Sequence, residues 1–107
     1  LQEKLGITVH NFEDLDQFRD IDGALALMSN LDAVISAPTA VRVLSAAVGT
    51  PTYVTHIQRP WTSFGHEGTE PMMPATRTVY GDRYADWALV MDRLTGILND
   101  MVAARAV

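Results

Sequence analysis

Two polar stretches of the sequence contain residue types that bind phosphate groups and sugars. The first is a turn at residues 36–39, which runs into an alanine-rich helix. Pro38 disfavours helical geometry in the residue before it and fits the first turn of a helix, so we predict that the helix begins here. Free backbone N–H groups at the positive end of a helix bind phosphate, and the sequence predicts such groups at Thr39, Ala40 and Val41.

A second interpretation of this turn needs no ligand. Ser36 or Thr39 would cap the helix, and water would bind the remaining N–H groups. Arg42 either adds positive charge beside a phosphate or lies solvated on the outer face of the helix. The sequence has no glycine-rich GxGxxG motif and no Walker lysine that would favour the first interpretation. The candidate phosphate-binding residues are Ser36, Thr39, Ala40, Val41 and Arg42.

The second polar stretch opens a long segment, residues 56–76, that is rich in proline and glycine. Irregular segments of this length in a small domain are usually functional or disordered. Arg59 would pair with a phosphate and Trp61 would stack on a base or a sugar. Alternatively, Trp61 is a hydrophobic plug that fixes the loop, and Arg59 is solvated. The candidate donor- or acceptor-binding residues of this loop are His56, Gln58, Arg59 and Trp61.

The histidines and carboxylates of the chain predict neither a metal site nor a catalytic pair. Its three histidines, His10, His56 and His66, have no short spacing and no matched carboxylate. Glu67 and Glu70 stand in the loop without an apolar partner, so we predict that both are ordinary solvated groups. We therefore assign no catalytic residue, no metal and no cofactor.

Length and composition limit the class of protein. A chain of 107 residues predicts a single domain, residues 1–107, with one core. The net charge of −5 argues against nucleic acid or an anionic membrane as the main partner. No apolar run is long enough to span a membrane, and the absence of cysteine fits the cytoplasm. Because the sequence starts at Leu1, we expect it to be a piece of a longer protein.

Short apolar strands alternate with helices along the chain. We predict strands at residues 7–10, 32–36, 52–55 and 77–80, and helices from Asp20 or Asp22 to about Asn30, from Thr39 to Val48, and from Tyr84 to about Ala104. This alternation predicts an α/β fold with a parallel sheet that is covered on both faces. Ligands of such sheets bind beyond the carboxyl ends of the strands, where residues 36–39, 56–75 and 81–83 would meet.

The order of these residues resembles the carboxyl-terminal domain of bacterial glycosyltransferase-like proteins. These include the heptosyltransferases and the transferase domains attached to tetratricopeptide repeats. One matching stretch is LMSNLDAVISAPTAVRVLSAAVGTPTYV, through Leu31, Asp32, Ile35, Ser36, Thr39, Leu44, Ala47, Gly49 and Pro51. The other is RPWTSFGHEGTEPMMPATRTVYGDRYADW, through Trp61, Phe64, Gly65, Pro71, Pro74, Arg77 and Trp87.

The resemblance implies the nucleotide-sugar half of a two-domain GT-B glycosyltransferase, with a three-layer Rossmann-like sheet. In that family the donor diphosphate rests against the turn that matches residues 36–41. Transfer needs no obligatory metal, and the catalytic base usually comes from the other domain. The resemblance therefore implies a nucleotide-sugar as substrate and an N-terminal Rossmann-like or repeat domain of the same chain as partner. By itself the chain is not expected to turn over.

The sequence departs from the family pattern at two positions of the turn and helix. Heptosyltransferases carry Asp just before the Thr and His four residues after it, whereas this chain has Pro38 and Val43. These departures favour an alternative in which the domain is catalytically inactive and serves protein–protein interaction in a repeat-containing protein. The retained Ser36 and Thr39 favour the transferase.

Overall fold

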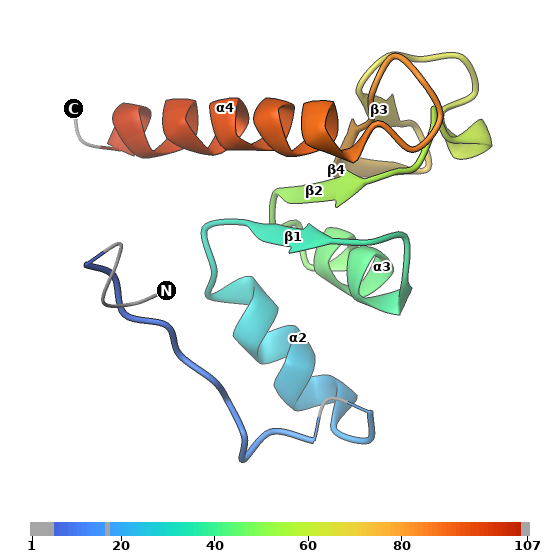
Figure 1. Ribbon diagram of the computed structural model, residues 1–107. Helices are drawn as coiled ribbons and strands as arrows, with labels where there is room; N and C mark the ends of the chain where they lie inside the picture. Colours follow the sequence, from blue (N-terminus) through green and yellow to red (C-terminus); the bar gives the residue numbers. More distant parts are fainter. Residues whose placement is uncertain (1–5, 17, 106–107) are drawn as a thin grey trace.

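A four-stranded mixed sheet with helices on both faces organises the chain (Figure 1). The computed structural model describes residues 6–16 and 18–105. Its elements are α2 (Ile21–Ser29), β1 (Val34–Ser36), α3 (Ala40–Ala47), β2 (Thr52–Thr55), the 3-10 helix η1 (Trp61–Ser63), β3 (Thr69–Glu70), β4 (Met73–Val79) and α4 (Trp87–Arg105). The strand order is β1-β2-β4-β3. The predicted α/β class is therefore confirmed.

The ends of the predicted helices are explained by local hydrogen bonds. The Asp20 side chain accepts a hydrogen bond from the Gly23 N–H at 2.9 Å and so begins α2. Gly49 ends α3 in the left-handed region, with a φ of +78° that favours glycine. The N–H groups of Gly49 and Thr50 bond to the carbonyls of Ala46 and Ser45, which is the Schellman arrangement.

The prediction of an entirely parallel sheet is wrong. β1, β2 and β4 are parallel, but β3 pairs antiparallel with β4. The segment at residues 56–76 is also less irregular than predicted, since η1, β3 and the start of β4 fall within it. The prediction of a strand at residues 7–10 is wrong, since the described sheet consists of β1, β2, β4 and β3. β1 is shorter than predicted, and its Ile35 is 48% exposed.

An apolar core lies between the sheet and α4. Val79 of β4 packs with Val90 and Leu94 of α4, and all three side chains are buried. Tyr53 of β2 and Ile97 of α4 border this cluster. Only part of the apolar surface of α4 is used in this core, because Trp87 and Val102 stay exposed.

The opposite face of the sheet, which α3 covers, is unusually polar. Thr52, Thr76 and Ser45 are completely buried there. The hydroxyl groups of Ser45 and Thr52 lie 2.6 Å apart, and Thr52 donates to the Thr50 carbonyl at 2.8 Å. The prediction of apolar strands is therefore wrong for this face, because β2 and β4 bury threonines on it. Each buried hydroxyl named here has a partner, which avoids the cost of leaving it unpaired.

Truncation of Leu94 tests the apolar core. Leu94→Ala should lower the free energy of unfolding by about 2–5 kcal/mol, because it removes buried methyl groups and leaves a cavity. Val102→Ala, at an exposed position of the same helix, is the control and should change it by less than about 0.5 kcal/mol. Urea unfolding followed by circular dichroism measures both. Equal losses in the two variants would show that α4 does not pack as described.

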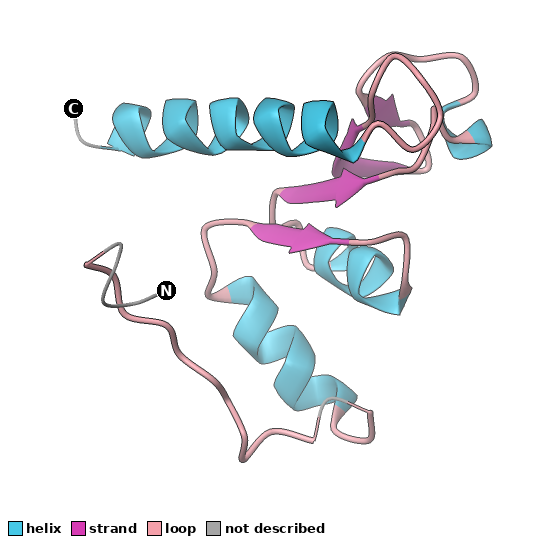
Figure 2. Cartoon of the chain, in the orientation of Figure 1, coloured by secondary structure: helices cyan, strands magenta, loops and turns pink. Residues whose placement is uncertain are grey.

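The loops that follow the parallel strands gather at one end of the sheet. Figure 2 shows them in pink at the end toward which the β1 and β2 arrows point. Among the described residues, none of the helices combines the length and apolar character needed to cross a membrane. The fold thus offers one loop-rich edge on which to look for a site.

Candidate functional site

The carboxyl ends of β1, β2 and β4 lie at one edge of the sheet because these strands are parallel. Hydrogen bonds join the loops that leave them. The His56 N–H donates to the Val79 carbonyl at 2.8 Å, and the Ala85 N–H donates to the Ile57 carbonyl at 2.9 Å. These two bonds bring together the segments after β2 and β4, and Pro38 of the turn after β1 lines a cavity with residues 56–62.

Two cavities open along this edge. The first, which we call the Arg42 cavity, has a volume of about 460 Å³ and is lined by Pro38, Arg42 and residues 56–62. The second, the Arg83 cavity, has a volume of about 470 Å³ and is lined by Gln58, Arg59, Glu67, Tyr80, Gly81, Asp82, Arg83 and Tyr84. Gln58 and Arg59 line both cavities, so the two adjoin.

Of the predicted phosphate-binding residues, one lines the Arg42 cavity. Arg42 lines the Arg42 cavity, whereas Ser36, Thr39, Ala40 and Val41 do not line it. The prediction of a free N–H at Thr39 is wrong, because this N–H donates to the Ala37 carbonyl at 2.7 Å. Among the described residues, the N–H groups of Ala40 and Val41 have no hydrogen-bond partner.

The prediction that a side chain of Ser36 or Thr39 caps α3 is also wrong. Thr39 occupies the N-cap position, but its side chain makes no capping hydrogen bond. The Ser36 hydroxyl donates to the Ala37 carbonyl at 2.6 Å and lies 3.3 Å from the Thr39 hydroxyl. Both side chains therefore stabilise the turn itself.

All four predicted loop residues, His56, Gln58, Arg59 and Trp61, line the Arg42 cavity. Trp61 is 81% exposed, which excludes its interpretation as a buried plug. Its ring meets that of Phe64 edge-on, with the centroids 6.1 Å apart. Arg59 is exposed and donates to the Gly65 carbonyl at 2.6 Å, which shapes the loop around it. Trp61 thus offers an open aromatic surface at the cavity.

A buried ionic cluster lies behind the Arg42 cavity and was missed by the sequence analysis. Its members are Arg42, His56 and Glu70, and we call it the Arg42–His56–Glu70 cluster. Glu70 is completely buried rather than solvated as predicted. Nη1 of Arg42 lies 3.4 Å from each carboxylate oxygen of Glu70, and the side chain of Arg42 is only 16% exposed. Arg42 is therefore not the solvated arginine of the alternative interpretation.

His56 has an incomplete set of partners in this cluster. Its side chain is 7% exposed, and Nε2 lies 3.9 Å from Glu70, too far for a hydrogen bond. Nε2 of His56 and Nε of Arg42 are both buried without a hydrogen-bond partner among the described residues. Burial lowers the pKa of His56, Glu70 opposes this by raising it, and Arg42 lowers it further. The imidazole is therefore neutral near pH 7.

The lowered pKa of His56 makes stability depend on pH. Unfolding returns the imidazole to its ordinary pKa of about 6.5, so below that pH the unfolded chain binds more protons than the folded chain. The free energy of unfolding should therefore fall as the pH drops through about 6.5 toward the lower pKa of the folded state. His56→Gln should flatten this part of the profile, whereas His66→Gln, at an exposed position, should leave it unchanged. An unchanged slope in His56→Gln would contradict the buried neutral imidazole.

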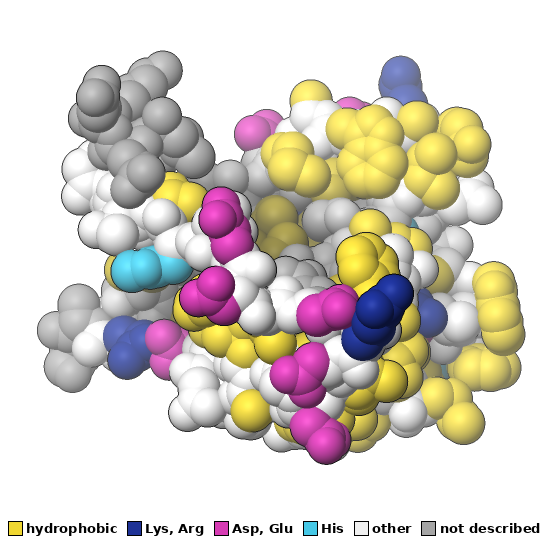
Figure 3. All heavy atoms as spheres, turned by 90° about the horizontal axis from the view of Figure 1, so that it is seen from below, with side chains coloured by type: hydrophobic (Ala, Val, Ile, Leu, Met, Phe, Trp, Pro, Cys, Tyr) yellow, Lys and Arg dark blue, Asp and Glu magenta, His cyan; other side chains and the backbone are white. Residues whose placement is uncertain are grey.

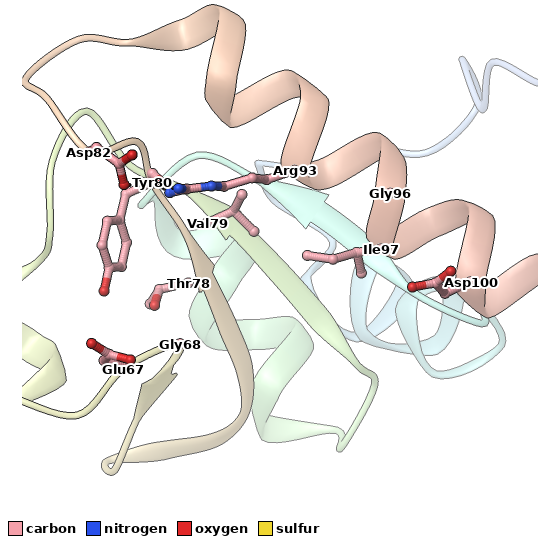
Figure 4. Close-up of a pocket in the computed structure, with 10 residues that line it drawn as sticks. All are labelled: Glu67, Gly68, Thr78, Val79, Tyr80, Asp82, Arg93, Gly96, Ile97 and Asp100. Atoms are coloured by element: carbon pink, nitrogen blue, oxygen red, sulfur yellow. Dashed lines mark hydrogen bonds and ion pairs between the residues drawn. The ribbon is translucent and has the colours of Figure 1, made fainter.

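A third cavity, of about 620 Å³, lies between α4 and the β3–β4 side of the sheet (Figure 4). Arg93 donates there to the Tyr80 carbonyl at 2.6 Å and to Asp82 at 2.9 Å. Glu67 and Asp100 also line it. With three carboxylates and one arginine that is already paired, this cavity disfavours an anionic ligand.

Comparison with known proteins finds one similarity that covers nearly all of the chain. Protein FlbA of Caulobacter vibrioides is 32% identical over 103 residues. The match covers 96% of this chain but 17% of FlbA, so the chain spans about a sixth of that protein's length. No protein-family model matches the chain, and no solved structure matches it. The similarity therefore relates the chain to one part of FlbA.

Proposed function

We propose that this chain is the nucleotide-sugar donor-binding domain of a glycosyltransferase and the Rossmann-like half of a two-domain GT-B enzyme in the cytoplasm. The observation that carries the proposal is the pair of adjoining cavities at the carboxyl edge of the parallel strands. This is where open α/β sheets bind nucleotides. Catalysis would need the second domain, whether Rossmann-like or attached to tetratricopeptide repeats, because the catalytic base of such transferases usually comes from that domain.

The charges that line the two cavities indicate which part of the donor each would bind. Among the described residues, the Arg42 cavity is lined by two arginines and by no carboxylate, although the whole chain carries a net charge of −5. Arg42 is paired with Glu70 behind the cavity wall, and Arg59 makes no ion pair with a described residue that would compete with a ligand. It would therefore hold the diphosphate, with Trp61 available to stack on the base. The Arg83 cavity is lined by two arginines but also by two carboxylates and two tyrosines, which suit the hydroxyl groups of a ribose or a sugar.

The departures from the family pattern affect this arrangement little. Val43 is exposed on α3 and does not line the Arg42 cavity, so a histidine is not missing from the cavity wall. Pro38 lines the cavity and adds an apolar edge without negative charge. Both observations support retained donor binding.

A second candidate function is protein–protein interaction without catalysis. Several large hydrophobic side chains are exposed, including Phe18, Trp61 and Met72. Figure 3 shows that hydrophobic side chains gather on the right-hand part of the face seen from below. Exposed hydrophobic patches are typical of interaction surfaces. Binding of a nucleotide-sugar would favour the transferase over this candidate.

Calorimetric titration with a panel of ligands tests the proposed function. The panel contains UDP, GDP, ADP, their sugar conjugates and the matching nucleosides. We expect one nucleotide to bind in preference to the others and its nucleoside to bind at least about tenfold more weakly, because the diphosphate contacts are lost. Absence of binding by every nucleotide, with the chain alone and within a longer protein that carries it, would overturn the proposal.

A further inference from the structure

We propose that His56 takes up a proton when an anionic ligand enters the Arg42 cavity, so that the imidazolium, facing Glu70, adds the positive charge that selects a diphosphate. This inference deepens the proposed function and rests on it. It assigns His56 a role in specificity, because a neutral imidazole would not distinguish a diphosphate from an uncharged ligand.

The geometry of the cluster carries the proposal. His56 lines the cavity, yet its Nε2 is buried and has no hydrogen-bond partner among the described residues. Glu70 lies 3.9 Å from that atom and is completely buried, so a small shift of the imidazole would form a charge-assisted hydrogen bond. A proton on Nε2 would complete an ion pair that the ligand-free protein leaves incomplete.

The charges around His56 explain why the ligand drives the proton uptake. Arg42 comes from α3, Glu70 from β3 and Arg59 from the cavity wall. In the ligand-free protein, burial and Arg42 together disfavour the imidazolium, although Glu70 favours it. A diphosphate would offset the charge of Arg42 and Arg59. The protonation equilibrium of His56 would then shift toward the imidazolium. Because ligand binding and proton uptake are linked, a lower pH would tighten ligand binding.

The experiment measures the affinity and the proton balance of UDP-glucose and GDP-mannose. The diphosphate of these compounds is esterified at both ends and does not titrate near neutral pH, so changes with pH report on the protein. For the one that binds, calorimetry in buffers of different ionisation enthalpy should show net proton uptake at about pH 7. The affinity should be about tenfold higher at about pH 5.5 than at about pH 7.5.

Two variants and one control make the result specific to His56. His56→Gln should abolish both the proton uptake and the rise in affinity, and Glu70→Gln should reduce both because the imidazolium loses its counter-charge. His66→Gln, at an exposed position, should behave like the unchanged chain. Binding without proton uptake, or with the same uptake in His56→Gln, would overturn this inference and leave the proposed function intact. Absence of binding by these two compounds and by every other member of the nucleotide panel, with the chain alone and within a longer protein that carries it, would overturn both.

Discussion

Replacement of Glu70 by alanine should lower the free energy of unfolding by about 3–5 kcal/mol, because it leaves Arg42 buried without its partner. The guanidinium of Arg42 lies 3.4 Å from both carboxylate oxygens, and its side chain is 16% exposed. Urea unfolding at neutral pH measures the loss. Glu67→Ala, an exposed carboxylate three residues earlier, is the matched control and should cost less than about 0.5 kcal/mol.

A second measurement on the Arg42–His56–Glu70 cluster separates the loss of stability caused by an unpaired charge from the loss caused by poorer packing. A double variant, Arg42→Met with Glu70→Leu, removes both charges and keeps the volume nearly constant. It should recover most of the stability lost in Glu70→Ala, because a buried ion pair replaced by apolar side chains is often neutral. If Glu70→Ala cost no more than Glu67→Ala, the burial of Glu70 would be wrong.

Replacement of Arg42 by glutamine should weaken nucleotide-sugar binding by about 10- to 100-fold. A hydrogen bond to a charged group contributes about 1.5–3 kcal/mol, and about 1.4 kcal/mol corresponds to a factor of ten. Arg59→Gln, at the exposed wall of the same cavity, should weaken binding by only about two- to fivefold, because its charge is screened by solvent.

The control for Arg42→Gln is Arg19→Gln. The side chain of Arg19 is 90% exposed, and Arg19 lines neither the Arg42 cavity nor the Arg83 cavity. Binding should be unchanged in this variant. Because Arg42→Gln also loses the ion pair with Glu70, its binding is measured well below its unfolding temperature. Equal affinities of Arg42→Gln and Arg19→Gln for the nucleotide-sugar would show that the diphosphate does not bind in the Arg42 cavity.

The parts of the fold that follow from local chemistry were predictable from the sequence. Asp20 caps α2 and Gly49 ends α3, as their residue types indicate. β2 has the predicted bounds, Thr52–Thr55. Because parallel strands place their carboxyl ends together, the grouping of the loop containing His56 with the turn before α3 could also be predicted.

The features that depend on distant partners were not predictable. The sequence around Glu70 is typical of a solvated loop. In the structure, β3 pairs with β4 and places Glu70 beside Arg42, which is 28 residues away in the sequence. A hint was present in the polar residues that alternate along the last strand, such as Thr76 and Thr78, since they indicate a polar layer beneath α3. The prediction of a strand at residues 7–10 is wrong, because these residues belong to none of the four strands of the described sheet.

The most direct test of the proposed donor site is a nuclear magnetic resonance titration of the ¹⁵N-labelled chain with the preferred nucleotide-sugar. We expect shifts in the backbone N–H signal of Arg42, in residues 56–59, and in the backbone and indole N–H signals of Trp61, all of which line the Arg42 cavity. Signals of Ile97 and Asp100, which line the acidic cavity beside α4, should stay in place. Shifts confined to the α4 side, or none at saturating ligand, would contradict donor binding at the carboxyl edge of the sheet.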